Sequence, residues 1–101
     1  MLTRAEALAA VASTIAELNC HRQLDDQVVV CDEETIERDL IFAFAYNSKK
    51  YIETGDERYM LYGCGPIIVN RRTGAVKVCG TNRSPVEFID DYERKAEAGV
   101  W

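Results

Sequence analysis

The chain contains few of the residues from which enzymes most often build a site. It has one histidine, His21, and only two prolines, Pro66 and Pro85. No Cys-x-x-Cys pair is present, and the glycine-rich run at residues 63–66 precedes an apolar stretch typical of a strand rather than a helix. Structural zinc sites usually begin with closely spaced cysteines, and phosphate loops lead into a helix N-terminus. The sequence therefore predicts no metal site and no cofactor.

The same scarcity argues against catalysis. His21 follows Cys20, but neighbouring residues on a helix point about 100° apart and do not face each other, whereas a nucleophile and its base must lie within hydrogen-bond reach. The other cysteines, Cys31, Cys64 and Cys79, are far away in the sequence. We expect free, largely buried thiols and no enzyme activity. An enzyme would instead show turnover sensitive to substitution of His21 or of a cysteine.

The length and net charge of the chain limit which classes of protein it can belong to. With 101 residues and a net charge of −5, the chain is predicted to be one domain, residues 1–101, with no basic patch for nucleic acid. No apolar run approaches the roughly 20 residues that a bilayer requires, and Glu6 and Glu17 interrupt the alanine-rich N-terminus. We expect a cytoplasmic protein that acts on neither membranes nor nucleic acid, with a partner that is, if anything, basic.

Local patterns predict the elements. A capping box at Thr3–Glu6 begins a helix that ends near Asn19 or Cys20, with an apolar face of Leu8, Val11, Ala12, Ile15 and Leu18. A second capping box at Ser84–Glu87, with proline at the first helical position, begins another helix that Gly99 ends. Its apolar stripe consists of Val86, Ile89, Tyr92 and Ala96, flanked by Phe88.

Strands are predicted between these helices. Val28–Cys31 is β-branched, and residues 40–46 alternate between large side chains (Leu40, Phe42, Phe44, Tyr46) and smaller ones (Ile41, Ala43, Ala45). The large face should meet the core, and the small face should lie nearer solvent or a partner. Residues 67–69 and 75–78 form a hairpin whose turn needs Gly74 in the left-handed region. Residues 47–63 are irregular, with one or two helical turns after Glu57.

The order α-β-β-β-β-α predicts an α+β fold. The economical arrangement is an antiparallel sheet of about four strands with the N- and C-terminal helices packed on one face.

Two surface features are candidates for binding. The first is an acidic segment with a single base, Arg38, among its acids: Asp25, Asp26, Asp32, Glu33, Glu34, Glu37 and Asp39. It is either a solvated turn or strand end, or a patch that steers a partner. The second is a set of tyrosines with nearby acids in the irregular segment: Tyr51, Glu53, Asp56, Glu57, Tyr59 and Tyr62. These tyrosines either anchor the loop to its own core or contact a partner.

Several short motifs resemble one known family. They are Tyr51-Ile-Glu-Thr-Gly-Asp56, Gly63-x-Gly-Pro-Ile-Ile-Val69, Thr73-Gly-Ala-Val76, Gly80-Thr81 and Pro85-Val-Glu-Phe-Ile-x-x-Tyr92. This ordered set, between Leu40 and Tyr92, looks like the immunity protein 35 family, small α+β proteins encoded beside bacterial polymorphic toxins. One departure is that Leu40 and Ile41 stand where the family often has a tryptophan.

The resemblance implies a non-enzymatic function. A family member would bind a cognate toxin, contact-dependent or secreted, in the producing cell's cytoplasm and block its active site or access to its substrate. The family supplies no catalytic residues, so the two acidic and tyrosine-containing sets above are the candidate contacts. The alternative function is a small chaperone-like or general protein-binding module, which would favour exposed apolar surface over a specific acidic face.

Overall fold

A computed structural model of the chain describes residues 1–23, 27–61 and 65–101. The elements follow in the order α1 (Arg4–Asn19), β1 (Val28–Glu37), β2 (Ile41–Ser48), α2 (Lys49–Thr54), the 3-10 turn η2 (Glu57–Tyr59), β3 (Ile67–Asn70), β4 (Val76–Val78) and α3 (Pro85–Glu97). The strands form one antiparallel sheet in the order β1-β2-β3-β4. This confirms the predicted α+β class and its order of strands. Helix α2, within the irregular segment, was not predicted.

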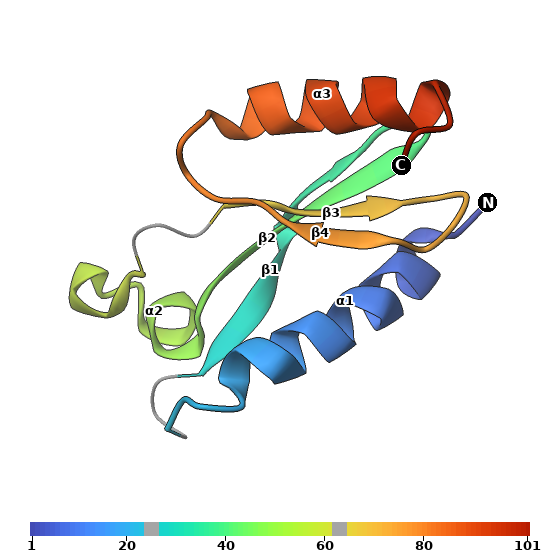
Figure 1. Ribbon diagram of the computed structural model, residues 1–101. Helices are drawn as coiled ribbons and strands as arrows, with labels where there is room; N and C mark the ends of the chain where they lie inside the picture. Colours follow the sequence, from blue (N-terminus) through green and yellow to red (C-terminus); the bar gives the residue numbers. More distant parts are fainter. Residues whose placement is uncertain (24–26, 62–64) are drawn as a thin grey trace.

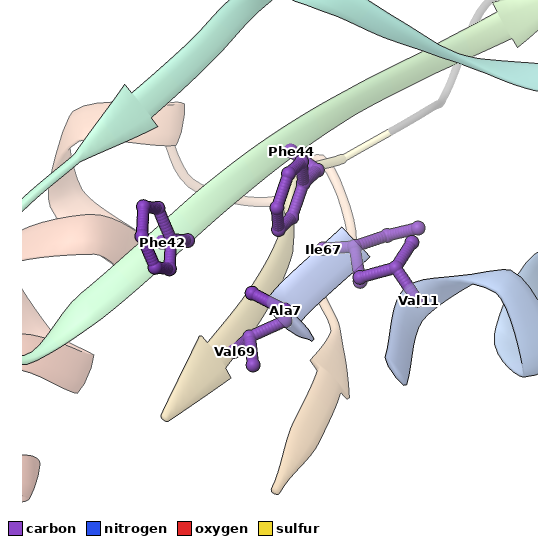
Figure 2. Close-up of a cluster of buried hydrophobic side chains, with 6 residues drawn as sticks. All are labelled: Ala7, Val11, Phe42, Phe44, Ile67 and Val69. Atoms are coloured by element: carbon purple, nitrogen blue, oxygen red, sulfur yellow. The ribbon is translucent and has the colours of Figure 1, made fainter. Parts of the chain in front are cut away.

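The two long helices lie on opposite faces of the sheet, so the predicted placement on one face is wrong (Figure 1). One buried cluster joins α1 to the sheet through Ala7, Val11, Phe42, Phe44, Ile67 and Val69 (Figure 2). A second cluster joins α3 to the other face through Ile41, Ala43, Ile68, Cys79, Ile89 and Ala96. The molecule therefore has three layers, with the sheet in the middle.

Strand β2 explains the correction. Its large side chains Phe42 and Phe44 are fully buried against α1, as predicted, but Ile41 and Ala43 are buried as well. Successive side chains of a strand point to opposite faces, so burial of both sets requires a layer on each side. The smaller side chains do not mark a solvent face at this end of the strand, because they make room for α3.

Helix α1 begins as predicted. The Thr3 hydroxyl accepts from the Glu6 N–H at 3.3 Å, and the Thr3 N–H donates to the Glu6 carboxylate at 3.1 Å. Of the predicted apolar face, Val11 is fully buried and Leu8 and Ile15 pack at its margin. Ala12 is exposed and Ala7 is buried instead. The buried stripe is therefore rotated toward Ala7, because the sheet approaches the helix from that side.

The C-terminal half follows the predicted turns and caps. In the β3–β4 hairpin, Gly74 has φ +77° and its N–H donates to the Asn70 carbonyl at 2.8 Å. The Ser84 hydroxyl caps α3 by accepting from the Glu87 N–H, and Gly99 follows the helix at φ +71°. Val86 is 56% exposed. Its predicted place in the buried stripe is therefore wrong, since it lies in the first turn of α3, beyond the second cluster.

Candidate functional site

The part of the acidic segment from Asp32 to Glu37 lies on strand β1, at one edge of the sheet, where the strand bulges. Cys31 pairs with Ala45 and Ile36 pairs with Ala43, so β1 uses three more residues than β2 over this interval. Bulges at sheet edges redirect side chains and interrupt pairing. The bulged interval contains Asp32, Glu33 and Glu34, and all three are exposed.

Two arginines from elsewhere in the chain neutralise part of this segment. Arg4 of α1 donates to the Asp32 carboxylate at 2.9 Å and to the Asp32 carbonyl at 2.6 Å. Arg71 lies 3.6 Å from the Glu37 carboxylate. Within residues 1–23, 27–61 and 65–101, neither Glu33 nor Glu34 forms an ion pair. The uncompensated negative charge of β1 is therefore concentrated at these two glutamates.

Side chains also close part of the outer edge of β1. The Asn19 amide accepts from the Val28 N–H at 2.8 Å and donates to the Val28 carbonyl at 3.1 Å, in the way a neighbouring strand would. Farther along β1, the Arg4 guanidinium donates a hydrogen bond to the Asp32 carbonyl. Open edge groups attract added strands, so these two contacts disfavour recognition by strand addition. A partner of β1 would be held by side chains.

A groove of about 420 Å³ lies between the bulge and helix α2. Its wall on β1 is formed by residues 30–34, and its wall on α2 is formed by Tyr51 and Ile52. Ile52 is 43% exposed. The structure therefore brings members of the two predicted sets, the acidic segment and Tyr51, into one hollow. Ile52 was not predicted, because an exposed isoleucine has no distinguishing signal in the sequence.

The remaining predicted residues of the irregular segment take part in local contacts. The Asp56 carboxylate accepts from the Arg58 guanidinium at 2.7 Å, which lowers the pKa of Asp56 and raises that of Arg58. Tyr59 lies under the Lys50 ammonium group, 4.5 Å from the ring centre. Glu53 pairs with Lys49 at 3.9 Å, and Glu57 is exposed. Asp25, Asp26 and Tyr62 lie outside the described residues.

Among the described residues, those considered for catalysis are not assembled into a site, and Cys64 lies outside the described residues. His21 and Cys20 are exposed at the end of α1, whereas Cys79 is buried beneath α3, where burial raises the pKa of its thiol. Among the described residues, no group of three or more histidine, cysteine or carboxylate side chains is arranged to hold a metal ion. Within that same part of the chain, none of the helices has the length and apolar character needed to span a bilayer.

Comparison with known proteins identifies the family. The family model described as Immunity protein 35 matches residues 5–94, a range that includes all of α1 except Arg4 as well as the motifs noted in the sequence. A curated relative, "Uncharacterized protein YrhB" of Escherichia coli (strain K12), is 34% identical over 58 residues. That alignment covers 56% of this chain and 62% of the relative. No solved structure is significantly similar. The chain belongs to the Immunity protein 35 family.

Proposed function

We propose that this member of the family binds a cognate bacterial toxin and neutralises it in the cytoplasm of the cell that produces it. The family membership implies an immunity protein. Binding would block the active site of the toxin or the approach of its substrate. The role is non-enzymatic, because the protein acts by occupying the surface of another macromolecule.

The observation that carries the proposal is the groove between β1 and α2. It combines two glutamates without ion pairs among the described residues, Glu33 and Glu34, with Tyr51 and the partly exposed Ile52. Complementary charge accelerates encounter and selects partners, whereas aromatic and apolar side chains supply most of the energy of an interface. This combination suits a basic protein partner.

The other predicted contacts form the margin of the proposed interface. Asp32, which also lines the groove, and Glu37 flank Glu33 and Glu34 on β1. Glu53 lies within α2, and Asp56, Glu57 and Tyr59 follow that helix in the chain. The Leu61 N–H donates to the Asn47 side chain at 2.8 Å. This hydrogen bond connects the segment that follows η2 to the end of β2. The margin is thus attached to the same strand pair as the groove.

Co-expression tests the proposal directly. A toxin gene encoded beside the gene of this chain would be induced in cells with and without the chain. We expect survival only when the chain is present, together with a stoichiometric complex between the purified chain and an inactivated toxin. Equal killing in both cultures would refute the proposal. Suppressed aggregation of unrelated unfolded proteins, without toxin binding, would favour the chaperone-like alternative.

Charge reversal of the free glutamates tests the site. Glu33→Lys combined with Glu34→Lys should lower the association rate with the toxin by about tenfold or more at low salt, and the remaining rate should depend less on ionic strength. Asp32 is left unchanged because Arg4 holds the bulge through it. Stopped-flow kinetics provide the measurement.

The control for this pair is Glu17→Lys combined with Glu97→Lys. It makes the same change in net charge at exposed positions near the ends of α1 and α3, where lysine suits the helix dipole. If the two double variants slow association equally, net charge rather than the groove directs the encounter, and the proposed site is wrong.

A further inference from the structure

A second hollow, of about 140 Å³, lies on the α3 face of the sheet. Ala43 and Ala45 of β2 form its floor, and Ile36, Pro66, Pro85 and Ile89 form its walls. Glu34 is the one charged side chain among its described lining residues. The hollow exists because α3 begins only at Pro85, so the helix covers Ile41 and Ala43 but leaves Ala45 half-exposed. An alanine there cannot fill the space that the helix leaves open.

This apolar pocket and the acidic groove adjoin each other at the bulge of β1, because Glu34 lines both. Cys31 is the register partner of Ala45, and cross-strand partners share a face. Cys31 lines the groove, Ala45 lines the pocket, and Glu34 lines both. In Figure 1, α2 and the first turn of α3 lie toward the same end of the sheet. The two hollows are therefore adjacent and share Glu34, with α2 beside one of them and the start of α3 beside the other.

We propose that this pocket receives one apolar side chain of the toxin, of the size of leucine, methionine or phenylalanine, next to a lysine or arginine that pairs with Glu34. The proposal rests on the function proposed above and names the anchor of that interface. A dry apolar cavity of about 150 Å³ accommodates a benzene molecule, so 140 Å³ fits one such side chain. Apolar anchors in desolvated pockets dominate the energy of many interfaces.

The negative charge beside the pocket favours a basic partner over a second copy of this chain. A second copy of this chain would bring its own net charge of −5 and its own Glu33 and Glu34 against the same two glutamates, and like charges across an interface are unfavourable. A basic partner is attracted by the same residues. The apolar walls offer no hydrogen bonds to a polar small molecule, so the pocket suits the apolar part of a side chain whose neighbour is a cation.

The experiment fills the pocket. Ala45→Phe occupies the floor with an aromatic ring and should weaken binding of the inactivated toxin at least about 30-fold, as measured by calorimetry. Ala12→Phe makes the same substitution on the exposed side of α1, across the sheet, and should bind like wild type. Circular dichroism and thermal unfolding establish that each variant is folded before binding is compared.

A measurement on the unmodified chain keeps the proposal testable even if Ala45→Phe does not fold. In the complex of the wild-type protein with a toxin carrying labelled apolar side chains, the methyl groups of Ala43 and Ala45 should show intermolecular NOEs and shifted resonances. The methyl group of Ala12 should show neither. Glu34→Gln should also reduce affinity, because the neighbouring cation loses its partner.

The outcomes separate the two proposals. If wild type binds the toxin, but Ala45→Phe binds equally well or the Ala45 methyl group shows no contact, the pocket is not the anchor and the function stands. If wild type does not bind the toxin, both proposals fail.

Discussion

The positions of three arginines in the fold determine which acidic side chains of β1 have an ion-pair partner. Counted along the sequence, Arg38 is its only base. In the fold, Arg38 turns toward α3, where it lies 3.3 Å from Glu93 and 3.5 Å from Asp90. Arg4 and Arg71, both distant in sequence, take its place beside Asp32 and Glu37. Which acidic side chains of β1 have an ion-pair partner among the described residues therefore depends on contacts between distant parts of the chain.

At Gly65 the fold leaves no room for a side chain. A Cβ atom there would lie 2.2 Å from the carbonyl oxygens of Cys79 and Gly80, so Gly65→Ala should destabilise the fold by about 3 kcal/mol or more, since backbone cannot yield as a side chain does. Gly55 has open space around it but a φ of +69°. Gly55→Ala should cost only about 1 kcal/mol.

The unfolding free energies of these two variants can be compared by urea titration, with the fluorescence of the single tryptophan, Trp101, as the signal. Equal losses of stability would show that backbone contact at Gly65 is not what requires a glycine there.

At the scale of elements, the start of α1 gives a pH-dependent contribution to stability. The N–H of Thr3 and its hydroxyl hold the pKa of Glu6 below its ordinary value of 4.5. As the pH falls through 4.5, the unfolded chain takes up this proton first, so the folded state loses stability. The contribution is fully present above that range and disappears below the pKa of the folded protein.

Glu6→Gln isolates this effect, because glutamine can still complete a capping box but does not titrate. The melting temperature of wild type should therefore fall more steeply than that of the variant between pH 6 and pH 3. Parallel curves from differential scanning calorimetry would contradict the assigned role of Glu6.

The alternation of side chains along a strand shows that it is a strand, but it does not show whether one or both faces of the sheet are covered. The alternation in β2 identified the strand and the face that meets α1. It did not reveal that α3 covers the other face, because alanine and isoleucine are compatible with both burial and exposure. The bulge in β1 was not predicted either, since its charged residues resemble a turn, and the register depends on β2.

At the scale of the whole molecule, Asn70 joins the hairpin to the C-terminal segment. Its side chain is 1% exposed, accepts from the Arg72 N–H at 2.8 Å and donates to the Trp101 carbonyl. The Trp101 ring packs edge-on against Tyr92, 4.9 Å between centres. One buried amide thus links β3 with the segment that follows α3.

Asn70→Asp should keep the contacts that the side-chain oxygen makes in the turn but place a carboxylate against the Trp101 carbonyl. We expect a loss of about 1–3 kcal/mol in unfolding free energy and easier quenching of Trp101 fluorescence by iodide. Asn82→Asp makes the same change at an exposed position and serves as the control. Unaltered quenching in Asn70→Asp would show that Trp101 is held by its ring alone.

The sequence by itself determined the helix caps, the β3–β4 turn, the order of the two long helices and the four strands, and the family, because each depends on residues a few positions apart or on short motifs. The tertiary structure alone decided which face each helix covers, which glutamates stay unpaired, and where the acidic groove and the apolar pocket form. These features depend on contacts between segments far apart in the chain. No local pattern encodes such contacts, since the same exposed glutamate or half-buried alanine fits many folds equally well.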